Sequence, residues 1–245
     1  MEEQITYQNV YHCEKCGDTG LVDVEVDGRA MMDYCKCHAI RKSLIALKKS
    51  GLQDSIKKCR FENFETDEPF RKEMKDLCER FLGQKESRFL YLGGQPGCGK
   101  THIATALCGS YITRGARTIY TTHQILLQEM KTFALDEEYS AVLHKYADVT
   151  VLYIDDFFKP ITETDRRSGQ KVRIPPTAAD IKHTFELINM RLVNNKITIL
   201  TSELFIDEII DIDEALGSRI KQKCGAEYAM NIAYAKGRNW RTRKA

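Results

Sequence analysis

A glycine-rich loop that ends in a lysine and a threonine carries the clearest chemistry in the sequence. Glycines let the backbone curl so that its N–H groups face phosphate oxygens, and a helix that starts there adds its positive end. Lys100 would place a charge on the β- and γ-phosphates, and the Thr101 hydroxyl would ligate Mg²⁺. We therefore predict an ATP site formed by the loop and the next residue, namely Gly94, Gln95, Pro96, Gly97, Cys98, Gly99, Lys100, Thr101 and His102.

Two consecutive carboxylates supply the second half of this site. Asp155 and Asp156 follow residues 149–154, an apolar run typical of a central strand that is covered on both faces. Ligands bind at the carboxyl end of such strands. We expect Asp155 to hold Mg²⁺ and Asp156 to orient or deprotonate the attacking water. The alternative is an ordinary strand end with two solvated acids.

Four of the nine cysteines are crowded near the N-terminus in two pairs. Between the pairs, alternating apolar residues around Asp27-Gly28 predict a β-hairpin that brings the pairs together. Four thiolates so placed are ligands for one tetrahedral, structural Zn²⁺, although His38 could replace the last cysteine. A segment this small buries too little apolar surface to fold alone, so a metal would stabilise it. The predicted zinc ligands are Cys13, Cys16, Cys35 and Cys37.

The elements that position these residues alternate along the chain as in a parallel α/β sheet. Strands are expected at residues 88–92, 117–121, 149–154 and 196–201, and helices at 100–111, from about 123, and from 177. At the last of these, Thr177 and Asp180 form a capping-box pattern. The predicted fold is α/β, a P-loop NTPase core with a parallel sheet flanked by helices.

A smaller unit precedes this core. It holds the cysteines and a helical pattern over residues 38–50, with Ile40, Leu44 and Leu47 on one face and Gly51 as its stop. We predict a zinc-binding domain at 1–52, a linker at 53–65 and an ATPase domain at 66–245.

Composition limits the class of protein. The chain has 245 residues, a hydrophobic fraction of 42% and a formal net charge of +2, which fits an ordinary globular protein. The first residues are acidic and no apolar run reaches the roughly 18 residues that span a bilayer. We therefore expect a cytoplasmic protein without membrane contact, in which the cysteines stay reduced.

Two segments carry positive charge without a clear pattern. Residues 160–176 lack apolar periodicity, and we expect them to form a loop that projects toward single-stranded DNA or lies on the surface. Near the C-terminus, Trp240 lies among basic residues; it could stack on a base, but packing against the sheet is expected. The basic residues of the first segment are Arg166, Arg167, Lys171 and Arg173.

With these motifs in place, the chain resembles the DnaC/DnaI-type helicase loaders and the IstB-type transposition ATPases of the AAA+ class. The resemblance covers nearly the whole chain. It rests on the cysteine motif, the phosphate loop, residues 154–158, residues 179–191, residues 201–203, and residues 213–220.

The resemblance implies roles for further residues. The arginine that matches Arg219 is an arginine finger in that family and reaches the γ-phosphate of a neighbouring subunit, so turnover requires a homo-oligomer and is low in the isolated chain. Glu203 or Ser202 occupies the position of the residue that senses phosphate, and we assign Glu203 to the catalytic set with Lys100 and Asp156.

The function implied is an ATPase that loads a DnaB-type hexameric replicative helicase onto single-stranded DNA. A transposition helper ATPase is the runner-up, and a P-loop kinase for small molecules is the alternative from a different class. The cysteine-rich front end favours the loader.

Overall fold

The computed structural model describes residues 12–49, 56, 58–84, 88–165 and 169–240. Its strands are β1 (Leu21–Val26), β2 (Arg29–Tyr34), β3 (Phe89–Gly94), β4 (Thr118–Thr122), β5 (Val151–Asp155), β6 (Ile161–Thr164), β7 (Lys171–Ile174), β8 (Ile197–Thr201) and β9 (Ala229–Ile232). Its helices are α1 (Cys37–Lys49), α3 (Pro69–Gly83), α4 (Lys100–Thr113), α5 (His123–Thr132), α6 (Tyr139–Ala147), α7 (Ala178–Val193), α8 (Ile206–Ile212) and α9 (Glu214–Cys224).

A five-stranded parallel sheet forms the centre of the fold, with strand order β4-β5-β8-β3-β9. The strand before the phosphate loop, β3, and the strand that ends in Asp155, β5, are therefore separated by β8 alone. Because all five strands run the same way, their carboxyl ends share one edge of the sheet. The phosphate loop and Asp155 meet at that edge.

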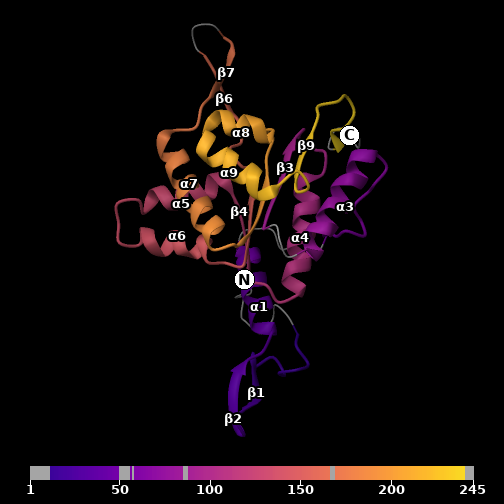
Figure 1. The fold of residues 1–245 in the computed structure, drawn as a ribbon, viewed down its shortest axis with the longest axis vertical. Helices are drawn as coiled ribbons and strands as arrows, with labels where there is room; N and C mark the ends of the chain where they lie inside the picture. The colour runs from indigo at the N-terminus through magenta and orange to yellow at the C-terminus, as the bar shows by residue number, and fades with distance from the viewer. Residues whose placement is uncertain (1–11, 50–55, 57, 85–87, 166–168, 241–245) are drawn as a thin grey trace, which may run out of the picture.

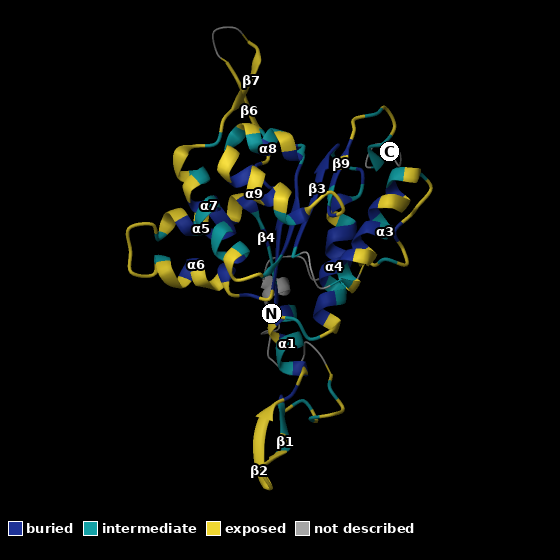
Figure 2. Cartoon of the chain, in the orientation of Figure 1, coloured by how far each residue is buried: buried dark blue, intermediate teal, exposed yellow. Residues whose placement is uncertain are grey.

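Helices cover both sides of the sheet, so the molecule has three layers in this part (Figure 1). Helices α3 and α4 lie on one side and α5 to α9 on the other. Every residue of β3 and β5 is buried, as expected for strands covered on both faces (Figure 2). The predicted parallel sheet flanked by helices is confirmed, as is the capping box at the start of α7.

The predicted hairpin near the N-terminus is also confirmed. Strands β1 and β2 pair antiparallel around a two-residue turn, in which Asp27 and Gly28 have φ of +52° and +74°. Both angles fit the type I′ turn that matches the twist of the two strands. The hairpin projects from the end of the molecule opposite to the β6–β7 hairpin (Figure 1).

Helix α1 joins the hairpin to the core. Ile40 and Leu44 pack against Ile112 of α4, as the predicted apolar face requires. The side chain of Leu47 and the predicted stop at Gly51 lie outside the described residues. The predicted domain boundaries stay a prediction.

Residues 160–176 correct one expectation, because β6 and β7 pair antiparallel where a loop was expected. All eight residues of the two strands are exposed. Each strand is only four residues long, and although Val172 and Ile174 alternate with Lys171 and Arg173 in β7, β6 shows no such alternation. Runs this short give no clear periodic signal. Backbone pairing, which sequence periodicity does not report, forms this element. Arg166 and Arg167 lie outside the described residues.

In the described part of the chain, no helix combines the length and the apolar character that crossing a membrane requires.

Candidate functional site

The phosphate loop connects β3 to α4 and needs its glycines for two reasons. Gly94, Gly97 and Gly99 have φ of +110°, +73° and +107°, a region that side chains disfavour. In addition, a Cβ on Gly94 would lie 2.1 Å from the carbonyl oxygen of Ile232. The loop therefore holds a curled backbone beside the first turn of α4, as anion binding requires.

A cavity of about 430 Å³ opens in front of this loop. Its walls combine most of the predicted site residues with several that the sequence did not indicate. They are Asn63, Glu65, Arg71, Pro96, Gly97, Gly99, Lys100, Thr101, His102, Asp155, Asp156, Lys159, Ser202, Glu203 and Trp240. Three predicted loop residues, Gly94, Gln95 and Cys98, are not among these lining residues.

Lys100 is buried and turned toward its own loop. Its Nζ donates to the carbonyl oxygens of Gly94 and Gln95 at 2.7 and 2.8 Å. Burial lowers the pKa of the Lys100 amine. A lysine held against the phosphate loop in this way can transfer its hydrogen bonds to phosphate oxygens within the same cavity.

The two predicted magnesium ligands meet at the end of β5. The Thr101 hydroxyl donates to Asp155 Oδ1 at 3.3 Å. Adjacent ligands of an octahedral Mg²⁺ lie about 3 Å apart, so these two oxygens fit one metal ion. Thr201, at the end of β8, also donates to Asp155 Oδ1. Sequence reasoning missed Thr201 because only the strand order brings it beside Asp155.

Asp156 faces the cavity in an unusual conformation, with φ of +52°. Its N–H donates to Asp155 Oδ1 at 3.0 Å, and its carboxylate pairs with Lys159 at 2.8 Å. Lys159 also lies 3.7 Å from Glu203, so it bridges two of the predicted catalytic carboxylates. No motif in the sequence marks Lys159.

Ser202 and Glu203 differ in what they contact. The Ser202 hydroxyl is buried, donates to the carbonyl oxygen of Phe157 at 2.6 Å, and accepts from the N–H of Leu204 at 3.0 Å. The hydroxyl thus fixes the turn that carries Asp156. Glu203 is partly exposed and its carboxylate lies in the cavity near Lys159.

Arg219 lies apart from the cavity of its own chain. It is exposed on α9, donates to Asn189 at 2.6 Å, and lies over the Phe185 ring at 4.9 Å. It is not among the described residues that line the cavity. The predicted role of Arg219 on a neighbouring subunit stays a prediction.

The four predicted zinc ligands come together at the base of the β1–β2 hairpin. Their Sγ atoms all lie within 4.8 Å of one another, with Cys13–Cys35 at 3.8 Å and Cys16–Cys37 at 3.4 Å. Sulfurs at about 2.3 Å from a tetrahedral Zn²⁺ are about 3.8 Å apart, so this donor set fits zinc. The ring of His38 lies beside Tyr34 at 4.4 Å, outside the thiol cluster.

A buried arginine holds the cysteine loop in place. Arg41 of α1 donates to the carbonyl oxygen of Asp18 at 2.9 Å and pairs with its carboxylate. The same carboxylate accepts from the N–H of Cys13 at 2.8 Å. Helix α1 and the cysteine loop therefore form one hydrogen-bonded unit.

The fold and this site define an ATP-binding protein of the AAA+ P-loop class. The chain belongs to the family of IstB-like ATP binding proteins, whose model matches residues 44–209. The cysteine cluster lies before the matched range.

Three known proteins illustrate the relationship. The Bacillus subtilis phage-like element PBSX protein XkdC is 30% identical over 90% of this chain and 85% of its own length. The uncharacterized protein YqaM of the same organism is 35% identical over 77% of this chain, and the match spans 60% of YqaM. The crystal structure of the DnaC helicase loader superposes with a TM-score of 0.56 at 18% identity, covering 73% of this chain and 97% of that chain.

Proposed function

We propose that this protein is an ATP-dependent loader that places a hexameric replicative helicase on single-stranded DNA. The observation that carries the proposal is the combination, in one chain, of a cavity at the phosphate loop and a separate cysteine-cluster unit outside the IstB-like range. The similarity of fold to the DnaC helicase loader and the phage-element relative XkdC support it. Such a role would place the protein in the cytoplasm.

In this proposal the ATP site works as an ATPase. Lys100 binds the β- and γ-phosphates, and Thr101 and Asp155 hold Mg²⁺, which would screen the phosphate charge. Asp156 takes a proton from the attacking water, and Glu203 helps to orient that water. Arg219 of a neighbouring copy supplies positive charge to the γ-phosphate during transfer, so the active species is a homo-oligomer.

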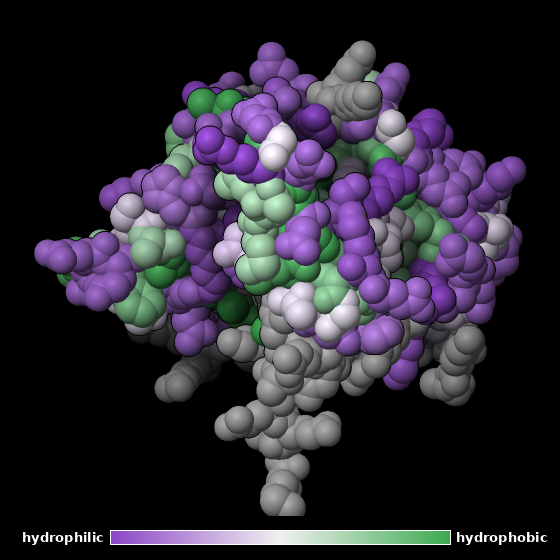
Figure 3. Space-filling view, turned by 90° about the horizontal axis from the view of Figure 1, so that it is seen from below, coloured by the Kyte–Doolittle hydropathy of each residue, from purple (hydrophilic) through white to green (hydrophobic). Residues whose placement is uncertain are grey.

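The zinc unit is proposed to dock on the helicase. Its hairpin exposes the large apolar side chains of Val26, Met31, Met32 and Tyr34. Figure 3 views the molecule from this end and shows hydrophobic residues gathered near the centre of the face. By the strand register, Val26 and Met31 lie on one face of the hairpin and Met32 and Tyr34 on the other. Exposed apolar side chains on a projecting hairpin support a role in binding another protein.

The test is a loading assay with the full chain, the host's replicative hexameric helicase and circular single-stranded DNA coated with single-strand-binding protein. We expect helicase to be recovered on the DNA only with the wild-type protein and ATP. Lys100→Ala is expected to fail although it should still bind helicase through the zinc unit. Equal loading by Lys100→Ala would refute the proposal.

The family match gives a second candidate, an IstB-type helper ATPase for transposition. That protein would recruit a transposase in place of a helicase. ATP-dependent capture of a transposase, together with no helicase loading in the assay above, would favour this candidate. The same family match disfavours a small-molecule kinase.

A further inference from the structure

The last described residues of the chain run along the outer side of the phosphate loop. We call residues 232–240 the C-terminal strap. The N–H of Gln95 donates to the carbonyl oxygen of Ile232 at 3.1 Å, and the N–H of Trp240 donates to that of Gly97 at 2.9 Å. Between these bonds, the Gln95 amide makes a two-way pair with the backbone of Ala235, at 3.0 and 2.9 Å. The strap and the phosphate loop are thus hydrogen-bonded at three points.

The strap also packs very closely on the loop. A Cβ on Gly97 would lie 1.9 Å from Oδ1 of Asn239. Glycine at this position is therefore needed for the close approach of the strap as well as for the curved backbone of the loop. Gln95, which does not line the cavity, has its amide engaged by the strap. These contacts fix the position of the strap relative to the loop.

Trp240 is held at the wall of the nucleotide cavity by a stack of side chains. The guanidinium of Arg71 lies between two rings, 4.6 Å from Trp240 and 4.7 Å from Phe64. Arg71 is itself buried and donates from Nε to the carbonyl oxygen of Glu65 at 2.6 Å. The arginine therefore fixes the indole, which is partly buried and lines the cavity.

The lining of the cavity holds two groups of side chains that differ in chemistry. Thr101 and Asp155 fit a metal ion beside the terminal phosphates. Arg71, Trp240, Asn63 and His102 form the second group, in which His102 Nε2 and Asn63 Oδ1 lie 3.2 Å apart. Where the first group holds the metal and the phosphates, the aromatic and polar side chains of the second group are the part of the lining suited to the sugar and the base.

We propose that Trp240 contacts the sugar–base end of the bound nucleotide and that the C-terminal strap is part of the nucleotide site. Arg71 is the positioning residue that presents the indole. This inference rests on the proposed ATP site. It makes the site selective for a nucleoside triphosphate over a bare polyphosphate, because an aromatic ring binds a base by stacking and has no attraction for phosphate.

The test compares ATP with inorganic tripolyphosphate by calorimetry, in the presence of Mg²⁺. Removal of a base–aromatic contact weakens binding by about five-fold to a hundred-fold or more, so Trp240→Ala should weaken ATP binding by at least about five-fold. Tripolyphosphate should bind wild type and variant within about two-fold of each other, since stacking contributes nothing to it. Trp240→Phe, which keeps a ring, should restore most of the ATP affinity.

A second measurement uses the fact that Trp240 is the only tryptophan in the chain. ATP should change its fluorescence in the wild-type protein and in the control Leu135→Ala, whose side chain is fully exposed away from the cavity. Tripolyphosphate should change it less.

The outcomes separate the two proposals. If wild type binds neither ligand, the proposed ATP site has failed. If ATP binds but Trp240→Ala retains wild-type ATP affinity, or loses both ligands equally, the role of Trp240 is overturned and that of the ATP site is not.

Discussion

At the scale of single residues, Asp156 combines a strained backbone with a position in the cavity. A φ of +52° is unusual for any residue with a side chain, although aspartate and asparagine tolerate it best. A strained backbone conformation of this kind is kept only where contacts with the surrounding residues hold it. Here Ser202 and the Asp155 carboxylate hold the backbone on either side of Asp156. The carboxylate is thereby aimed into the cavity.

Asp156→Asn tests its predicted role. Asparagine accepts the same backbone conformation, so the fold and ATP affinity should be retained within about three-fold, while the loss of the base should lower kcat by about a hundred-fold or more. Steady-state turnover and calorimetric ATP affinity measure the two effects. Turnover near the wild-type level would remove Asp156 from the catalytic set.

The fourth zinc ligand is a second prediction at this scale. Cys37 lies within the thiol cluster and His38 lies beside Tyr34. Cys37→Ser should therefore lose most of the bound zinc, and His38→Ala should keep about one ion per chain. Metal content of the purified variants by mass spectrometry decides between them. The reverse pattern would assign the ligand to His38.

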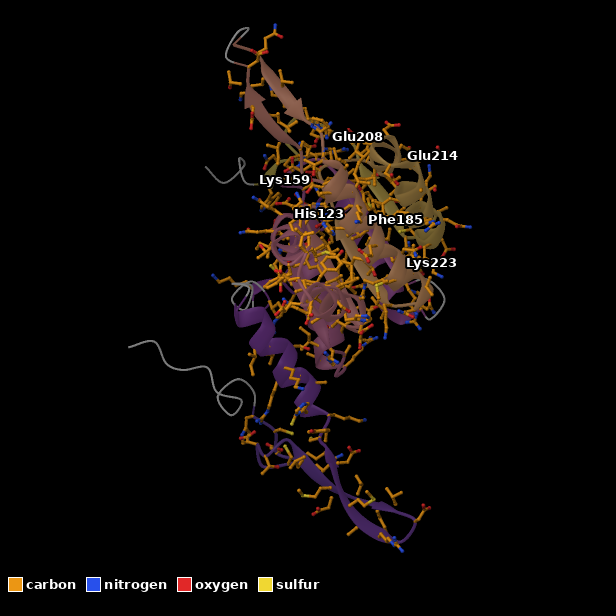
Figure 4. All side chains as sticks on the ribbon, turned by 90° about the vertical axis from the view of Figure 1, so that its left-hand side faces the viewer. His123, Lys159, Phe185, Glu208, Glu214 and Lys223 are labelled. Atoms are coloured by element: carbon orange, nitrogen blue, oxygen red, sulfur yellow. The ribbon has the colours of Figure 1, made fainter. Side chains whose placement is uncertain are left out.

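At the scale of elements, a buried histidine joins three of them around the turn that carries Asp156. His123, at the start of α5, accepts from the N–H of Phe158 at 3.1 Å through Nδ1. Its Nε2 then carries the proton and donates to Thr184 of α7 at 2.8 Å. Burial lowers the pKa of His123 to about 3. Figure 4 shows His123 and Lys159 below the projecting β6–β7 hairpin.

This histidine predicts a dependence of stability on pH. The side chain of an unfolded histidine has a pKa of about 6.5. Below that pH, His123 is therefore protonated in the unfolded chain and stays neutral in the folded chain. The free energy of unfolding is therefore highest above about pH 6.5 and decreases as the pH falls below that value. Between pH 7.5 and 5.5 the wild type should lose about 1.4 kcal/mol more than His123→Gln. Urea unfolding at both pH values measures this, with the exposed His144→Gln as control.

The β6–β7 hairpin is the element proposed to reach DNA. Reversing the charges of Lys171 and Arg173 should weaken binding of single-stranded DNA and reduce the slope of log affinity against log salt by about 1.4. Reversal of Lys72 and Arg80, exposed on α3, is the matched control. Equal effects of the two double variants would indicate general charge attraction, and the hairpin would then have no special role.

At the scale of the whole molecule, the ATP site is proposed to be shared between copies. Lys100→Ala and Arg219→Ala should each be inactive. The first lacks the lysine that binds the phosphates, and the second lacks the arginine that acts on the ATP of the neighbouring copy. In an equal mixture, about a quarter of the interfaces would combine both intact residues, so ATPase activity should return to about that fraction. A mixture that stays inactive would argue against action in trans.

The sequence by itself determined the local features of this protein. The phosphate loop, the cysteine hairpin, the buried strand before Asp155 and the capping box of α7 were predicted and are present. Each is a short segment whose geometry depends on residues a few positions apart. Glycines that permit positive φ, or an Asp-Gly turn between alternating residues, therefore leave a recognisable spacing.

The tertiary structure alone decided which distant segments meet. It placed Thr201 beside Asp155, Lys159 between Asp156 and Glu203, and the C-terminal strap on the phosphate loop. It also buried Arg191 against the ends of α6 and β8, where it donates to Tyr146, Ala147, Val149, Ile197 and Thr198. These contacts follow from the strand order and from close packing between elements. Because neither produces a periodic pattern or a fixed spacing along the chain, no single sequence reveals them.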